Sequence, residues 1–218
     1  MNNVIKVKHV YKKIGEQEIL QEINLELRSG KIYGLIGRNG SGKTVLLKCI
    51  AGFMEVTKGE IWIDDKKIGK DTKFIEDMGF IINTPGFLPE LSGIKNLEYL
   101  ASIKKMIKRK DIMAAMESVG LDPESKKPVG KYSTGMKQRL GIAQAIMEKP
   151  SILILDEPMN GLDEDAVEEM RNLFLKLKKD RLILITSHNK EDIEILCDKV
   201  YHMKGGKLEQ ILKGTANV

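Results

Sequence analysis

Apolar and polar residues alternate in the first part of the chain, and this alternation predicts strands. In NNVIKVKHV and EILQEINLEL about every second residue is apolar, which predicts two half-buried strands joined by a turn at residues 13–16. The more continuous apolar stretch KIYGLIG predicts a buried strand, and GEIWID and DMGFIIN predict two shorter ones. The chain therefore begins with strands of two kinds, some half-exposed and some fully covered.

Later segments repeat apolar residues every three or four positions, which predicts helices. One helix, KTVLLKCIAG, ends at Gly52, and a helical insert extends from Leu91 to about Val119 between two loops that contain Pro and Gly. The helices GMKQRLGIAQAIMEK and DAVEEMRNLFLKLKK then alternate with the buried strands SILILDE and RLILITS. This order predicts an α/β fold with a mostly parallel sheet that is covered on both faces.

Composition and charge narrow the class of protein. The 218 residues are 42% hydrophobic, as expected for one globular domain, and the net charge of +5 comes from 36 basic and 31 acidic residues that are mixed along the chain. We therefore expect no nucleic-acid partner. Cys49 and Cys197 lie in apolar, helix-like segments and are expected to be buried, reduced thiols.

No apolar run approaches the ~20 residues of a membrane-spanning helix, and the N-terminus lacks the pattern of a signal peptide. We expect a cytoplasmic protein that reaches a membrane only through a partner.

A glycine-rich turn, GRNGSGKT, joins the third strand to the first helix. It fits the pattern G-x-x-x-x-G-K-[ST], in which glycines let consecutive backbone N–H groups converge on phosphate oxygens. A chance match is the alternative, but the strand-loop-helix context argues against it. Lys43 would reach the β- and γ-phosphates, and the Thr44 hydroxyl would bind Mg²⁺. The residues expected to bind the nucleotide here are Gly37, Arg38, Asn39, Gly40, Ser41, Gly42, Lys43, Thr44 and Val45.

Two carboxylates and a histidine follow later buried strands. Asp156 and Glu157 end ILILDEP, and His188 ends ILITSHN. Because the carboxyl ends of parallel strands line one edge of a sheet, we expect all three near the glycine-rich turn. Asp156 would bind Mg²⁺, Glu157 would orient or deprotonate water, and His188 would contact the γ-phosphate. Alone, each has a structural alternative: a polar strand end, a helix N-terminal charge or a structural histidine.

The stretch NKED, from Asn189 to Asp192, matches the N-K-x-D pattern that binds guanine in small GTPases. Such a protein would carry D-x-x-G after the earlier carboxylate strand, whereas Asp156 is followed by Glu-Pro-Met. We therefore interpret NKED as the start of a helix capped by Asn189.

In order and spacing, these motifs resemble those of the nucleotide-binding subunit of ATP-binding cassette (ABC) transporters, over residues 4–206. GRNGSGKT resembles the phosphate loop, ILILDEP the second nucleotide strand, NGLD the D-loop, TSH the switch histidine, and YSTGMKQR a variant of the signature LSGGQ. The resemblance implies a P-loop NTPase fold in one domain, residues 1–218. It has a mostly parallel core (1–83 and 150–218), an N-terminal antiparallel β subdomain and a helical subdomain (about 88–149).

The resemblance also implies a function. It describes an ATPase that uses ATP and Mg²⁺, with Glu157, His188 and Lys43 as catalytic residues, and that drives a separately encoded integral membrane permease from the cytoplasmic face. YSTGM and PGFLPELSG resemble the ATPases of bacterial drug and peptide-antibiotic exporters, so we expect an exporter. The alternatives are a soluble ABC-type ATPase, such as one serving iron–sulfur assembly, and a nucleotide sensor without turnover.

The signature residues are Ser133, Thr134, Gly135 and Met136. Ser133 is a good helix N-cap and Gly135 leaves the backbone accessible, so this helix start is either a simple cap or an anion site. The resemblance implies that it faces the γ-phosphate held by a second ATPase subunit, in a homodimer, and that Asp163 of the D-loop communicates between subunits.

Two positions depart from the family. Asn83 stands where a Q-loop glutamine is usual and is one methylene shorter, so we expect a bridging water between it and Mg²⁺. Ile14 stands where an aromatic ring usually stacks on adenine, and Tyr11, three residues earlier, is the candidate substitute.

Overall fold

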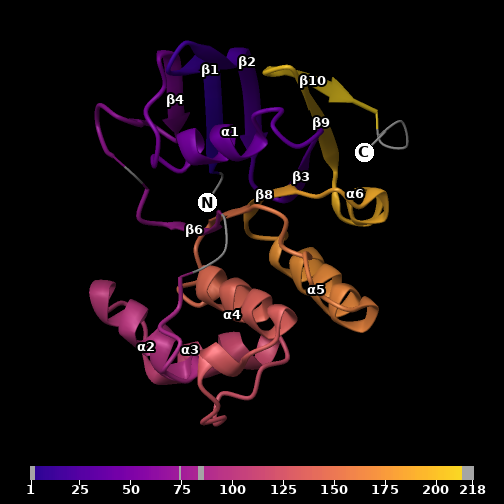
Figure 1. Cartoon of the computed structure of the whole chain (residues 1–218). Helices are drawn as coiled ribbons and strands as arrows, with labels where there is room; N and C mark the ends of the chain where they lie inside the picture. Colours follow the sequence, from indigo (N-terminus) through magenta and orange to yellow (C-terminus); the bar gives the residue numbers. More distant parts are fainter. Residues whose placement is uncertain (1–2, 74, 83–85, 213–218) are drawn as a thin grey trace.

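The structure, a computed structural model, describes residues 3–73, 75–82 and 86–212 and contains two β-sheets. Figure 1 shows the smaller sheet at the top and most of the helices at the opposite end. The smaller sheet is antiparallel, in the order β2 (Gln17–Arg28), β1 (Val4–Ile14), β4 (Lys58–Ile63) and β5 (Lys66–Lys67).

The larger sheet is parallel except at one edge, where β10 runs antiparallel to β9. The order of its strands is β10 (Lys207–Ile211), β9 (Lys199–Lys204), β3 (Lys31–Ile36), β8 (Leu182–Thr186), β7 (Ile152–Leu155) and β6 (Met78–Ile81). The predicted α/β class, with a mostly parallel core and an antiparallel N-terminal sheet, is confirmed.

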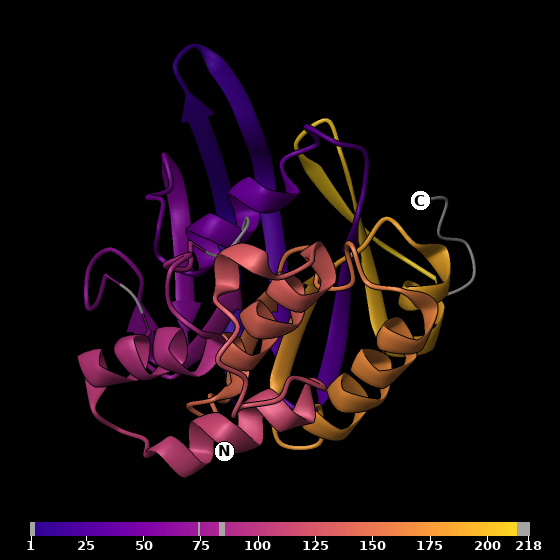
Figure 2. The same ribbon diagram turned by 60° about the horizontal axis from the view of Figure 1, so that its bottom comes forward.

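Helices α2, α3 and α4 lie together, with α5 beside them, in Figures 1 and 2. The helices are α1 (Lys43–Ile50), α2 (Gly93–Lys104), α3 (Arg109–Ser118), α4 (Thr134–Ile146), α5 (Glu164–Leu177) and α6 (Lys190–Leu196), with a 3-10 turn η1 (Val129–Lys131). The boundaries of the helical subdomain, about 88–149, stay a prediction.

Side chains of the central strands pack on both faces of the larger sheet. In β7, Ile152 and Ile154 join a core with α1 and the smaller sheet, whereas Leu153 and Leu155 join a core with α2 to α5. Since successive strand residues point to opposite faces, burial on both sides requires an unbroken apolar sequence. The stretches IYGLI, ILIL and LILI are apolar for this reason.

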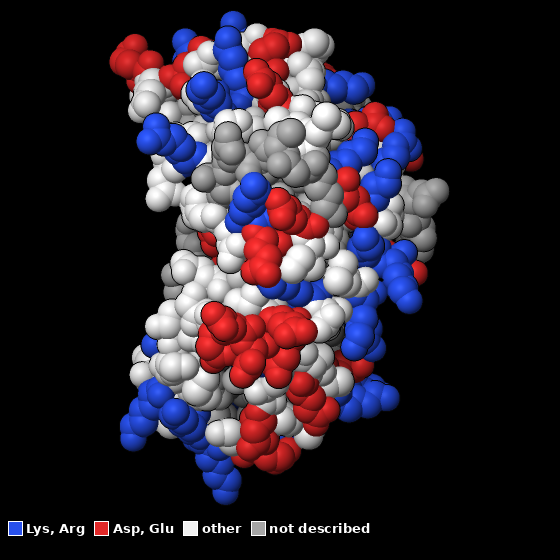
Figure 3. Space-filling view, turned by 90° about the vertical axis from the view of Figure 1, so that its right-hand side faces the viewer, with Lys and Arg blue, Asp and Glu red and all other residues white. Residues whose placement is uncertain are grey.

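Cys49 and Cys197 are fully buried, as predicted. On the face of the molecule shown in Figure 3, acidic side chains gather in the lower half and basic side chains lie around them. Among the described residues, no helix is both long and apolar enough to span a membrane.

Candidate nucleotide-binding and catalytic site

The glycine-rich turn between β3 and α1 has two positions whose backbone favours glycine. Gly37 has φ 143°, and a Cβ there would lie 2.2 Å from the Met203 carbonyl oxygen. Gly42 has φ 109° and is the N-cap of α1, where it offers no side chain to the first turn of the helix. Backbone N–H groups at this helix start are therefore available to an anion.

Lys43 and Ser41 lie inside this turn. Lys43 is 7% exposed, and its Nζ donates to the carbonyls of Gly37 at 2.6 Å and Arg38 at 3.3 Å. Burial lowers the pKa of Lys43, and the charges of Glu157 and Asp156 oppose that shift. The buried Ser41 Oγ has no hydrogen-bond partner within the described structure. A buried cation and an unsatisfied hydroxyl in one loop fit a phosphate group.

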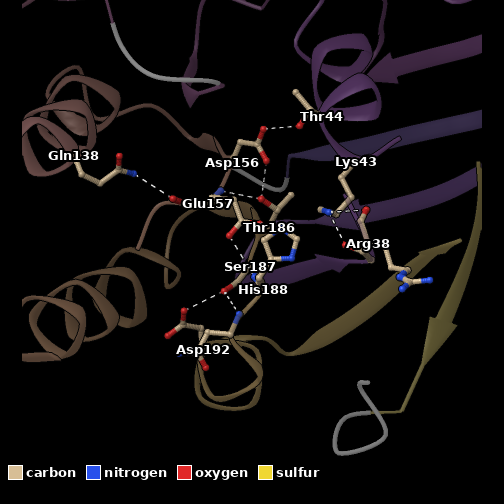
Figure 4. Close-up of polar contacts among 12 residues, drawn as sticks. Arg38, Lys43, Thr44, Gln138, Asp156, Glu157, Thr186, Ser187, His188 and Asp192 are labelled. Atoms are coloured by element: carbon tan, nitrogen blue, oxygen red, sulfur yellow. Dashed lines mark hydrogen bonds and ion pairs between the residues drawn. The ribbon is translucent and has the colours of Figure 1, made fainter. Parts of the chain in front are cut away.

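Asp156, directly after β7, connects this turn to β8. It accepts hydrogen bonds from Thr44 Oγ1 at its Oδ2 (2.7 Å) and from Thr186 Oγ1 at its Oδ1 (2.7 Å). Thr186 also accepts the backbone N–H of Glu157 at 2.8 Å. Figure 4 shows these side chains converging. The carboxylate and hydroxyl oxygens of Asp156 and Thr44 are the hard ligands that Mg²⁺ prefers, so the residues present fit this ion.

Glu157 and His188 face one another beside Asp156 (Figure 4). The backbone N–H of His188 donates to Glu157 Oε2 at 3.2 Å. His188 Nε2 lies 3.0 Å from Glu157 Oε1 without the alignment of a hydrogen bond, so this buried oxygen accepts none from the described residues. Burial raises the pKa of Glu157, while the charges of His188 and Lys43 and the His188 N–H act against that shift. A raised pKa and an unused oxygen suit a proton acceptor.

One cavity of about 410 Å³ joins these groups. The predicted residues that line it are Asn39, Gly40, Gly42, Lys43, Thr44, Val45, Asp156, Glu157 and His188. Gly37, Arg38 and Ser41 belong to the same turn but do not line the cavity. Gln17 and Ile19 of β2 also line it, and the sequence had not indicated them. Their place in the cavity depends on how β2 crosses the turn, which strand periodicity does not specify.

The adenine contact expected of Tyr11 stays a prediction. The Tyr11 hydroxyl donates to Glu22 on β2, and neither Tyr11 nor Ile14 lines the cavity. Ile14 is 48% exposed near the end of β1. Asn83 lies outside the described residues, so its expected contact with Mg²⁺ stays a prediction.

The signature residues form a separate region at the start of α4. Ser133 Oγ accepts the Met136 N–H at 3.1 Å, so the predicted N-cap is confirmed. Ser133, Gly135, Met136 and Asp163 line a second cavity of about 360 Å³, and Thr134 packs beside Gly161. Asp163 caps α5 by accepting the Ala166 N–H at 2.9 Å. The structure thus brings the signature and D-loop together, in a cavity distinct from that of the phosphate turn.

The stretch NKED begins α6, as predicted. Asn189 Oδ1 accepts the Glu191 N–H at 2.8 Å, and Asp192 is buried, where it accepts from Ser187 Oγ and pairs with Arg171 of α5. These bonds hold the segment that carries His188.

The sequence patterns did not indicate Arg171 or Thr186 as residues of the site. Thr186 left one signal, because a polar residue that ends a fully buried strand must find a partner.

Comparisons with known proteins agree along most of the chain. A family model described as ABC transporter matches residues 20–160. YybJ of Bacillus subtilis (strain 168), named an uncharacterized ABC transporter ATP-binding protein, is 44% identical and aligns over 94% of this chain and 95% of its own. BcrA of Bacillus licheniformis, named a bacitracin transport ATP-binding protein, is 42% identical over 95% of this chain and 69% of its own.

A solved structure shares the fold. The dimeric structure of MJ0796, described as a bacterial ABC transporter cassette, superposes with a TM-score of 0.83 at 25% identity. The superposition covers 95% of this chain and 99% of the MJ0796 chain.

Proposed function

Because the chain belongs to the ABC transporter family and is an ATP-binding ATPase subunit of that family, we propose that it powers an exporter of peptide antibiotics as an ATP-dependent homodimer. The observation that carries the proposal is the single cleft that holds the glycine-rich turn, the Thr44–Asp156 pair and the Glu157–His188 pair. These groups supply phosphate binding, metal binding and proton transfer within reach of one γ-phosphate.

In the proposed reaction, a water molecule attacks the γ-phosphorus of ATP. Glu157 accepts the proton of that water, and the bond between the γ-phosphorus and the oxygen that bridges to ADP breaks, which leaves ADP and phosphate. The raised pKa of Glu157 strengthens it as a base. His188 donates from its ring to the γ-phosphate, and Lys43 leaves its own loop carbonyls to bind the β- and γ-phosphates.

Thr44 Oγ1 and Asp156 Oδ2 would hold Mg²⁺, and Asn83 would complete the set through water. When bound, Mg²⁺ neutralises charge on the β- and γ-phosphates. Thr44 Oγ1 donates to Asp156 Oδ2 at 2.7 Å, which keeps both side chains beside the turn.

The signature supports the homodimer. Ser133 and Thr134 are exposed at the N-terminus of α4, and the cavity beside them is not the one lined by the phosphate turn. We place the γ-phosphate of a second copy against this helix start, where the helix dipole and free N–H groups attract an anion. Two such sites are related by a two-fold axis, and Asp163 lies next to each. ATP then favours the closed dimer, and loss of the γ-phosphate opens it.

The names of the relatives support a proposed cargo. BcrA is named for bacitracin transport and shares 42% identity, so we assign a peptide antibiotic as cargo, export as the direction and a separately encoded permease as the membrane partner. The chain itself would remain on the cytoplasmic face.

The proposed cargo is tested by measuring the resistance of the native host to peptide antibiotics. Deleting the gene should lower the concentration of bacitracin-like or lantibiotic peptide that stops growth, wild-type chain should restore it, and Glu157→Gln should not. An unchanged sensitivity to a panel of such peptides, in a strain whose purified chain hydrolyses ATP, would reject the cargo class and leave the ATPase assignment intact.

A further inference from the structure

Glu157 has a backbone conformation that needs support. It is not glycine, yet its φ is 50°, in the left-handed region that L-residues seldom adopt. Such a conformation persists only where neighbouring groups hold it. Since the direction of its carboxylate depends on this backbone, the groups that hold the backbone also aim the base.

Two elements hold it from opposite sides. Thr186 of β8 accepts the Glu157 N–H, while Gln138 of α4 binds the following carbonyls: Gln138 Nε2 lies 3.2 Å from Glu157 O and 3.0 Å from Pro158 O. The Asn160 N–H also donates to Glu157 O at 3.1 Å, which closes a turn. Figure 4 shows Gln138 approaching Glu157 from the helix side.

The amide of Gln138 suits this place chemically. Both neighbours are carbonyl oxygens, so the amide must present its NH₂ group to them, and two N–H donors match two acceptors. A carboxylate of the same shape has no donor, and a methionine of similar length has none either. Gln138 is half-buried, in a helix whose N-terminus is the signature.

From these contacts we infer that Gln138 is a positioning residue for catalysis, which aims the Glu157 carboxylate through its backbone and ties the signature helix to the base of the same subunit. The inference rests on the proposed role of Glu157. Gln138 does not line the nucleotide cavity, so its loss should change turnover rather than ATP binding. A shift of α4 would carry Gln138 with it and move the backbone carbonyls of Glu157 and Pro158.

The experiment compares Gln138→Met and Gln138→Glu with Gln144→Met. Gln144 is another half-buried glutamine of α4 and is not a partner of the Glu157 or Pro158 carbonyls in the described structure. We expect Gln138→Met to lower kcat about 10-fold with KM for ATP within about two-fold of wild type, because a misplaced base slows only chemistry. Gln138→Glu should lose at least as much, and Gln144→Met should match wild type.

A double-mutant cycle with Glu157→Gln gives the second readout, measured as single-turnover release of labelled phosphate. If Gln138 acts through Glu157, Gln138→Met should slow the Glu157→Gln protein by less than about two-fold. An equal fold-loss in both backgrounds, or a wild-type kcat in Gln138→Met, would overturn the inference. If Gln138→Met fails to fold, as judged by thermal melting, Gln138→Glu decides by the same kcat criterion.

The same measurements distinguish failure of the proposed role of Glu157 from failure of the positioning role of Gln138. If Glu157→Gln retains normal turnover, the base assignment fails and the positioning role falls with it. If Glu157→Gln is slow while both Gln138 variants are normal, only the positioning role is overturned.

Discussion

The phosphate cleft and the signature region differ in how their polar groups are satisfied. In the cleft, Thr44, Asp156, Thr186 and Glu157 form a continuous chain of hydrogen bonds, and Lys43 binds carbonyls of its own loop. At the signature, Ser133 caps its own helix, but Ser133 and Thr134 face solvent. The first region is preorganised within one subunit, whereas in our proposal the second binds an anion that another subunit holds.

Among the variants of the phosphate cleft, replacement of Glu157 should lower turnover most. We expect Glu157→Gln to lower kcat by about 10²–10⁴-fold while ATP still binds, because the amide cannot accept the proton. Phosphate release measures the loss, and size-exclusion chromatography with ATP should show a trapped dimer. The matched control, Glu168→Gln on the exposed side of α5, should behave as wild type. Comparable turnover in the two variants would contradict the role of Glu157.

Breaking the hydrogen-bond chain at β8 should have the next largest effect. Thr186→Val keeps the shape of a fully buried side chain but removes the hydroxyl that binds Asp156 Oδ1 and the Glu157 N–H. We expect about 1–3 kcal/mol lower free energy of unfolding, from the groups left unsatisfied, and a slower kcat. Urea denaturation and phosphate release measure the two effects. Wild-type stability together with wild-type kcat would show that the chain of bonds is dispensable.

Acidification should affect the cleft through Glu157. In the proposed mechanism the Glu157 carboxylate is the active form, and burial raises its pKa above the ordinary 4.5. We therefore expect kcat to fall with decreasing pH at a higher pH than a surface glutamate titrates. Phosphate release between about pH 5 and 8 measures this limb. The residual activity of Glu157→Gln should lack it. An identical acidic limb in that variant would assign the titration to another group.

The smallest expected effect is on the affinity for ATP, through stacking of an aromatic ring on adenine. An aromatic ring at position 14 should supply the stacking surface that Ile14 lacks, so Ile14→Tyr should strengthen ATP binding by about 1 kcal/mol. Equilibrium titration with a fluorescent ATP analogue measures it, with Tyr11→Leu as the companion variant. If Tyr11→Leu weakens binding and Ile14→Tyr leaves it unchanged, Tyr11 is the stacking residue.

Local sequence patterns were sufficient to predict the motif residues of the cleft and two helix caps. The motif residues of the cleft follow strands of one parallel sheet, so their convergence could be expected from topology, and Ser133 and Asn189 were recognisable as caps. Thr186 and Gln138 contact the base from segments 29 and 19 residues away, and no local periodicity reports such contacts. Strands β9 and β10 were not predicted from the alternation of apolar residues. The neighbours of Tyr11 were not predicted either, because side-chain partners across strands depend on register.

The central claim is that the signature of one subunit completes the cleft of another, and mixing two inactive variants tests it most directly. Lys43→Ala removes the phosphate lysine and Ser133→Arg blocks the signature, so each homodimer should be inactive. A mixed dimer has one intact site if the signature acts in trans. Equimolar mixing should then restore up to about one quarter of wild-type ATPase activity, from half the dimers with one of two sites intact. A mixture as inactive as its components, although it forms mixed dimers, would contradict the account.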